Sequence, residues 1–87
     1  MYAKITKDLL YDGEGISHSH VGTIPVSNGI ISGELLQVRL LDDDGEHYYT
    51  AEADDEALEP LFEWAMRDSG VTLLQVRKDG KWVDTIA

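Results

Sequence analysis

Apolar residues recur at helical spacing in one stretch of this chain, residues 54–70, with the sequence DDEALEPLFEWAMRDSG. The apolar positions fall at i, i+3, i+4, i+7 and i+8, which is typical of a helix that covers another surface along one side. The apolar stripe consists of Leu58, Leu61, Phe62, Ala65 and Met66, and the opposite side carries Glu56, Glu59, Glu63 and Arg67. The pattern predicts an amphipathic helix over about residues 55–69.

Both ends of this helix carry recognisable signals. Asp54 or Asp55 supplies a short carboxylate that accepts hydrogen bonds from the free amides of the first turn. Gly70 follows the stripe, and glycine takes the left-handed cap conformation without strain. Because Pro60 lacks an amide proton and crowds the carbonyl four residues earlier, we expect regular helix only from about Ala57, after a tight lead-in turn.

Before the helix, residues 34–53 show the alternation of a β-hairpin. Asp44-Gly45 is a favoured two-residue turn because both positions tolerate positive φ. A loop longer by one residue would place Thr50 and Glu52 among the core leucines, so the purity of the apolar face favours the two-residue loop. That register pairs Leu36 with Ala53, Val38 with Ala51, Leu40 with Tyr49 and Leu41 with Tyr48, and leaves Gln37 and Arg39 on the polar face.

After the helix, residues 71–87 form a second predicted hairpin that turns at Asp79-Gly80. Arg77 would face Trp82, and we interpret this pair as a cross-strand cation-π contact, with Trp82 as part of a partner-binding patch as the alternative. The other expected pairs are Val76 with Val83, Leu74 with Thr85 and Leu73 with Ile86.

The first third of the chain is less regular. Residues 2–6 alternate as a short strand, with Ala3 and Ile5 on one side, and residues 9–11 are an apolar group expected to pack under the sheet. Residues 16–25 hold a glycine and a proline and form at most an edge strand. Together the elements predict a single α+β domain, residues 1–87, with an antiparallel sheet of about five or six strands, the order ββββαββ and one helix packed on one face.

Composition limits the classes of function. Seventeen acidic and seven basic residues give a net charge of -10, which repels nucleic acid and anionic lipid and attracts basic partners. The chain has no cysteine, which excludes disulfides and thiolate metal sites and slightly favours the cytoplasm. No signal-peptide pattern and no apolar run of about 20 residues are present, so we expect neither a secretory leader nor a membrane span.

Two histidines form the best candidate for a metal site. His18 and His20 would project from the same face of a strand, as many metal ligands do. Asp12, Glu14 or His47 could supply a third ligand. Two histidines in an acidic loop occur more often without a metal than with one, so we expect neither a metal nor a cofactor.

Other site chemistry is not supported by the motifs. A calcium loop that began at Asp42 would need glycine at its sixth position and an acid at its twelfth, where the chain has His47 and Ala53. Ser17 and Ser19 lack the elbow, oxyanion hole and orienting acid that a serine nucleophile requires. We therefore predict that the protein is not an enzyme.

The acidic residues are the remaining chemical resource. Two groups of acids, residues 42–46 and 54–56, lie at opposite ends of one predicted strand. Neighbouring carboxylates on the helix lie ~5 to 6 Å apart, which is similar to the spacing of phosphates along a nucleic-acid strand. Trp64, which lies off the apolar stripe, is expected to be half-buried, with an interface anchor as the alternative. The predicted partner-binding residues are Asp42, Asp43, Asp44, Glu46, Glu56, Glu59, Glu63 and Trp64. The alternative for the acids is an acidic face that only keeps a small protein soluble.

These patterns favour a non-catalytic acidic protein that binds a protein with a basic surface, as an inhibitor that occupies a nucleic-acid-binding site, without binding nucleic acid or membrane itself. A small-ligand or metal-binding module that uses His18 and His20 is one alternative. The other is a self-associating structural protein, such as a homodimer. Its contact would be Leu35, Leu41, Tyr48 or Trp64.

The segments ITKD (5–8), VGT (21–23), VRLLDDDGEHYY (38–49) and GKW (80–82) resemble a group of small, uncharacterised bacterial proteins. The resemblance implies no activity and no catalytic residues, because the group has none assigned. In size and acidity the chain is also similar in general character to phage-encoded anti-CRISPR and anti-restriction proteins, a likeness that no motif carries.

Overall fold

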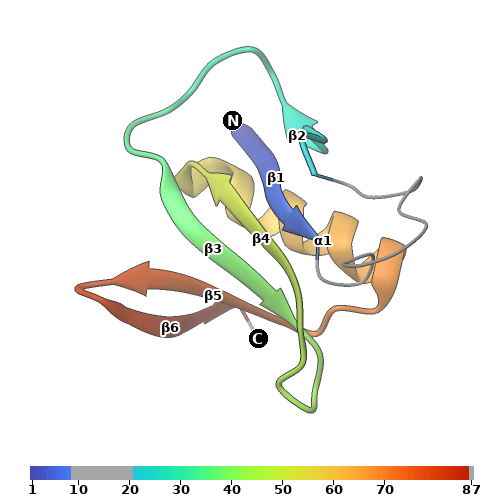
Figure 1. Cartoon of the computed structure of the whole chain (residues 1–87). Helices are drawn as coiled ribbons and strands as arrows, with labels where there is room; N and C mark the ends of the chain where they lie inside the picture. The colour runs from blue at the N-terminus through green and yellow to red at the C-terminus, as the bar shows by residue number, and fades with distance from the viewer. Residues whose placement is uncertain (9–20, 87) are drawn as a thin grey trace.

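The computed structural model describes residues 1–8 and 21–86, and within these residues the chain forms a six-stranded antiparallel sheet with one helix (Figure 1). The predicted α+β class and the order ββββαββ are confirmed. The strands are β1 (Tyr2–Asp8), β2 (Val26–Ser27), β3 (Leu36–Leu41), β4 (His47–Ala53), β5 (Leu73–Lys78) and β6 (Lys81–Ile86), and a 3-10 turn, η1 (Asp55–Ala57), leads into helix α1 (Leu58–Ser69).

The strands lie in the order β2-β1-β4-β3-β5-β6, so β4 and β3 occupy the middle of the sheet. Helix α1 lies behind the sheet in Figure 1 and covers one of its faces. The core fills the space between them. From the sheet it includes Ile5, Val38, Leu40, Tyr49, Leu74 and Val76, and from the helical segment Ala57, Leu58, Leu61 and Ala65.

The helix begins and ends as predicted. Asp54 is the N-cap of η1, regular helix starts at Leu58, and Gly70 closes α1 with a φ of 76°. Most of the apolar stripe is buried or packs against the core, but the prediction was wrong for Met66, which is 45% exposed. The buried residues of α1 are Leu58, Leu61 and Ala65, so Met66 lies at the edge of the side of the helix that packs on the sheet.

The β3–β4 hairpin has the predicted core register but a different loop. Leu36 pairs with Ala53 and Leu40 with Tyr49 as expected. The loop, however, has three residues, because the Asp42 amide donates to the Glu46 carbonyl at 3.0 Å. Leu41 consequently pairs with His47 and not with Tyr48, and the register shifts between Leu40 and Leu41.

Tyr48 is the extra residue that reconciles the longer loop with a pure apolar face. A bulge at this position takes up one residue of β4, so Thr50 and Glu52 stay on the open face of the sheet. The argument from face purity was therefore right about the core and wrong about the loop. The loop is decided by the Asp42 side chain, whose Oδ1 accepts from the amides of Asp44 and Glu46 at 2.9 and 2.8 Å.

The β5–β6 hairpin turns at Asp79-Gly80, with φ values of 51° and 77°, as predicted. The expected pairs Val76–Val83 and Arg77–Trp82 are confirmed. A second register shift makes Leu74 the partner of Ile86, so the predicted pairs Leu74–Thr85 and Leu73–Ile86 were wrong.

The cation that lies over Trp82 comes from a different strand than predicted. It is the Arg39 guanidinium of β3, 4.5 Å from the ring centroid. The Arg39 Nε donates to Gln75 Oε1 at 2.6 Å, and the Gln75 amide donates to Asp84 Oδ1 at 2.7 Å. A polar row therefore crosses three neighbouring strands on the face opposite α1.

Strand β1 is longer than predicted and runs to Asp8, with a register shift between Ile5 and Lys7. After this shift Asp8 pairs with Tyr49 and is buried. The edge strand β2 follows the segment where an edge strand was expected, and it pairs with the start of β1. The predicted apolar group at 9–11 lies outside the described residues.

The residues expected to mediate self-association are less exposed than that alternative requires. Leu41 is buried, which contradicts the expectation, while Leu35, Tyr48 and Trp64 are half-buried. Leu41 lies outside the main core cluster and faces the side of the sheet opposite α1, since it alternates with the core residue Leu40 along β3. No helix within the described ranges is long and apolar enough to span a membrane.

Candidate functional site

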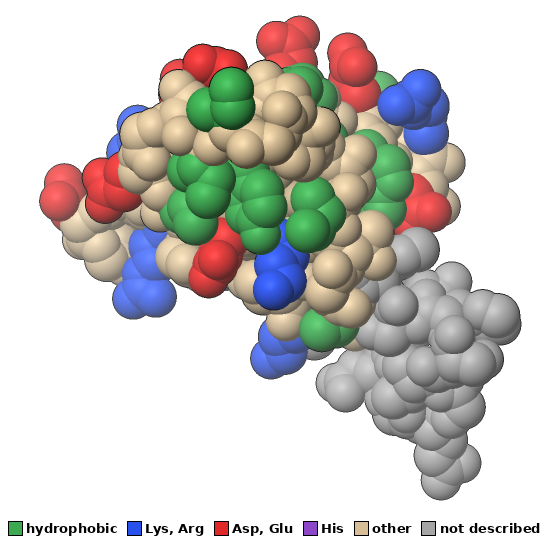
Figure 2. Space-filling model, turned by 90° about the horizontal axis from the view of Figure 1, so that it is seen from above, with side chains coloured by type: hydrophobic (Ala, Val, Ile, Leu, Met, Phe, Trp, Pro, Cys, Tyr) green, Lys and Arg blue, Asp and Glu red, His purple; other side chains and the backbone are tan. Residues whose placement is uncertain are grey.

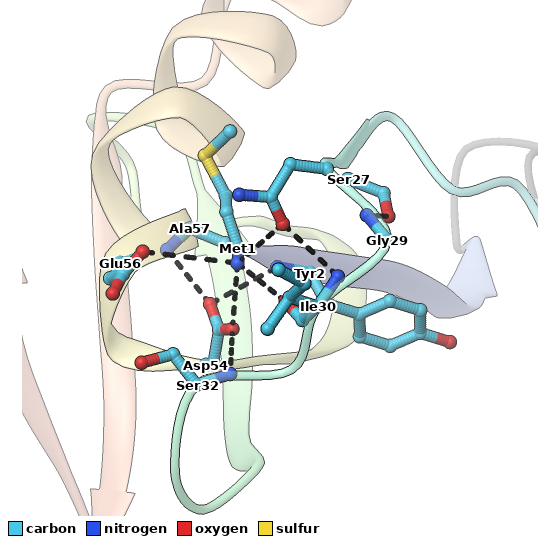
Figure 3. A network of polar contacts seen from close by, with 10 residues as sticks. Met1, Tyr2, Ser27, Gly29, Ile30, Ser32, Asp54, Glu56 and Ala57 are labelled. Carbon is cyan, nitrogen blue, oxygen red and sulfur yellow. Dashed lines mark hydrogen bonds and ion pairs between the residues drawn. The ribbon is translucent and has the colours of Figure 1, made fainter.

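The most densely connected polar group in Figure 3 is the Asp54 carboxylate, at the junction between β4 and η1. The side chain is fully buried. Its Oδ1 accepts from the amides of Tyr2 at 3.1 Å and Ala57 at 3.0 Å. Its Oδ2 accepts from the Ser32 amide at 2.9 Å and lies 3.4 Å from the Met1 amine. One carboxylate therefore joins β1, the loop before β3 and the start of the helix.

The donors around Asp54 keep it charged. Burial acts to raise the pKa of this carboxyl because a charged group loses its hydration. Hydrogen bonds act in the opposite direction, the Ser32 amide most strongly and the Tyr2 amide next. Together with the Met1 amine and the Ala57 amide they hold the pKa of Asp54 below its ordinary value of 3.8.

The same network fixes the loop between β2 and β3. The Met1 amine donates to Asn28 Oδ1 at 3.0 Å and to the Ile30 carbonyl at 2.6 Å. Asn28 Oδ1 also accepts from the Ile30 amide at 3.1 Å. Glu56 lies beside this cluster, with its carboxylate 3.8 Å from the Met1 amine (Figure 3).

The sequence indicated only the capping role of Asp54. Its contacts with Tyr2 and Ser32 join residues that are far apart along the chain, and no local pattern reports them. The single sequence signal for this role was the position of Asp54 directly after the apolar strand that ends at Ala53. The next residue, Asp55, is also an acid but is exposed.

Two of the predicted partner-binding acids at the β3–β4 tip have structural roles. Asp42 accepts from two loop amides and from the Tyr48 hydroxyl at 3.1 Å, and the hydrogen bond from the Glu46 amide chiefly lowers the pKa of Asp42. The same contact raises the pKa of Tyr48. Asp43 Oδ1 accepts from the Thr72 hydroxyl at 2.6 Å, which ties the loop to the start of β5.

The other predicted acids lie on exposed surface. Asp44 and Glu46 are exposed at the hairpin tip, and Glu56, Glu59 and Glu63 are exposed on the helical segment. The tip and the helix start lie at opposite ends of β4, a strand of seven residues, so the two groups are separated by roughly 20 Å and do not form one cluster. The sequence also placed the two groups at opposite ends of one strand, but with a separation of roughly 30 Å.

Trp64 is half-buried against the core, as expected. Its ring lies 5.6 Å from that of Tyr49 with an interplanar angle of 45°. The Tyr49 hydroxyl donates to Asp68 Oδ2 at 2.6 Å and also contacts the Ser69 hydroxyl. Burial and the bond to Asp68 raise the pKa of Tyr49, so this phenol is a structural donor.

The candidate metal ligands His18 and His20, with Asp12 and Glu14, lie outside the described residues. Within 1–8 and 21–86 no group of three or more histidine or acidic residues could hold a metal, and no pocket is present. The His47 Nε2 lies 2.9 Å from the Tyr49 carbonyl and 3.0 Å from the Thr50 hydroxyl. Burial chiefly lowers the pKa of His47, which favours the neutral ring.

The fold and these contacts define a small α+β protein. Its buried polar side chains make hydrogen bonds that support the fold, and its exposed surface is rich in carboxylates. No protein-family model matches the chain, and no curated protein or solved structure shows significant similarity to it. The likeness to small bacterial proteins therefore contributes no residue assignment.

Proposed function

We propose that this protein is a non-catalytic, acidic binding protein whose partner is a protein with a basic surface, and that it inhibits this partner by occupying its nucleic-acid-binding site in the cytoplasm. The supporting observation is the charge distribution over the β3–β4 tip, β4 and α1. Residues 40–66 contain ten of the seventeen acids and no lysine or arginine. Acidic side chains therefore outnumber basic ones along these elements, which favours a partner with a basic surface.

The exposed members of this surface are the candidates for direct contact. Asp44 and Glu46 project at the tip, and Glu59 and Glu63 lie on the outer side of α1. Asp42 and Asp43 already accept hydrogen bonds from the protein, so they position the tip. The exposed carboxylates offer only acceptor oxygens, which suit lysine and arginine donors.

Three matched double variants test this proposal, and each changes the net charge by two units. The tip variant is Asp44→Asn with Glu46→Gln, and the helix variant is Glu59→Gln with Glu63→Gln. The control variant neutralises exposed acids elsewhere, Glu34→Gln with Asp79→Asn. None of these side chains accepts a hydrogen bond that supports the fold in the described structure, so the variants are expected to fold.

The measurement is capture of partner proteins from a cell lysate on the immobilised protein, followed by elution with duplex DNA. The tip or the helix variant should recover less of a basic partner than the control variant, and duplex DNA should displace that partner from the unmodified protein. Equal recovery by all three variants would contradict an acidic contact surface. Retention of the partner against DNA would contradict occupation of a nucleic-acid site.

A further inference from the structure

Four of the six strongly exposed large apolar side chains in the described structure belong to the connection between β1 and β3. Val21 and Ile24 precede β2, while Ile30 and Ile31 follow it and are 66% and 52% exposed. Figure 2 shows hydrophobic side chains gathered side by side on this end of the molecule, where the N-terminus and the β2–β3 loop lie. Ile30 and Ile31 are consecutive in the chain, and exposed apolar side chains that lie next to one another mark interaction sites.

The loop that carries the two isoleucines is held from its backbone. The Ile30 amide and carbonyl bind Asn28 and the Met1 amine, and the Ser32 amide binds the buried Asp54 carboxylate. The backbone on both sides of Ile31 is thus fixed while the side chains point outward. A partner that covers them orders little of this loop, so more of the contact energy appears as affinity.

The rim of this patch is acidic. Asp55 and Glu56 are exposed at the start of the helix. The Glu56 carboxylate approaches the Met1 amine, which binds the Ile30 carbonyl, so the rim and the apolar centre are adjacent. The Met1 amine is a positive group beside Glu56, and the chain has no lysine or arginine from residue 8 to residue 38 or from 40 to 66, so further positive groups would come from the partner.

From this arrangement we infer that Ile30 and Ile31 form the apolar centre of a docking surface for a protein segment in which apolar side chains are flanked by lysine or arginine. Asp55 and Glu56 form its acidic rim. Protein interfaces commonly have this anatomy, an apolar centre that carries most of the energy and a charged rim that sets orientation and association rate. The inference rests on the proposed binding of a basic protein and specifies where it docks.

A synthetic peptide probes this surface directly. In the probe peptide three leucines are flanked on each side by two lysines, and in the control peptide serines replace the leucines. Titration of the full chain, followed by amide chemical shifts, should perturb residues 29–32 and 54–57 with the leucine peptide. The serine peptide should bind roughly tenfold or more weakly, because it loses the burial of apolar surface.

The decisive variant is Ile30→Ser with Ile31→Ser, which changes only exposed side chains and should keep the thermal midpoint of unfolding. Its dissociation constant for the leucine peptide should rise by roughly tenfold or more. Val83→Thr, which alters an exposed apolar residue on β6, is the matched control and should leave binding unchanged. Equal binding by the isoleucine variant, or shifts that map elsewhere, would overturn the inference.

A second copy of the chain is the competing occupant. Light scattering that shows a dimer lost in the isoleucine variant would also overturn the inference, because the patch would then serve self-association. Failure here is distinguishable from failure of the proposed function. The tip and helix variants retain both isoleucines. If those variants lose partner capture while the isoleucine variant captures the partner normally, the proposed acidic contact surface is supported and the docking patch is contradicted.

Discussion

The Asp54 carboxylate is buried and charged, and such a group stabilises a fold only while its donors stay in place. In Asp54→Asn, the side-chain NH2 group would face one of the backbone amides that now donate to the carboxylate. We expect the free energy of unfolding to fall by about 2 kcal/mol. Urea denaturation measures it, and Asp55→Asn, with the same charge change on an exposed neighbour, should cost much less.

The contribution of Asp54 also depends on pH. Its pKa in the folded protein lies below its ordinary value of 3.8, so the stabilisation is complete above that value and is lost as the pH falls through the lower folded pKa. The difference in unfolding free energy between the unmodified protein and Asp54→Asn should therefore shrink from about pH 5 to about pH 2. A difference that stays constant over this range would show that charge is not what the network stabilises.

Among the strands, the contact between Arg39 and Trp82 gives the sharpest test of the observed sheet order. Arg77 faces Trp82 across the β5–β6 hairpin, yet the guanidinium over the ring comes from β3. A double-mutant cycle of Arg39→Met with Trp82→Leu should give a coupling energy of about 0.5 to 1 kcal/mol. The matched cycle of Arg77→Met with Trp82→Leu should give a smaller value, and a coupling energy for Arg77 larger than that for Arg39 would contradict the contact.

The elements differ in how far the sequence determined them. The helix and both hairpins were predicted because their signals are local: a 3.6-residue stripe, an Asp or Gly cap and two Asp-Gly turns. The Arg39 contact was missed because it requires β3 to lie beside β5, which is a property of the strand order. The loop of the first hairpin was missed because the side chain of Asp42 competes for the loop amides, an effect that alternation of apolar residues does not report.

The site residues followed the same division. Sequence reasoning placed the acids of the tip and the helix on the surface, where most of them lie, but it did not separate exposed Asp44 from Asp42, which caps the loop. The network around Asp54 was missed beyond its cap, since its partners are brought together only by the complete fold. The exposure of Ile30 and Ile31 was missed for a related reason, because burial depends on what lies opposite.

At the scale of the whole molecule, a net charge of -10 on 87 residues produces self-repulsion that opposes the compact state. We expect the urea midpoint to rise as sodium chloride increases from about 0.01 M to about 0.5 M, because the screening length falls from about 30 Å to a few ångströms. The Glu59→Gln with Glu63→Gln variant should show a smaller rise. An unchanged or lower midpoint at high salt would mean that repulsion is not a significant cost.

The bulge at Tyr48 has a consequence for how this protein can change. A two-residue loop without a bulge and the observed three-residue loop with one leave the same pairs from Leu40–Tyr49 onward. The conformation of the hairpin loop is therefore independent of the core pairs. Substitutions that change the loop need not disturb the residues that pack against α1. The proposed contact residues Asp44 and Glu46 can therefore change while the scaffold that carries them stays constant.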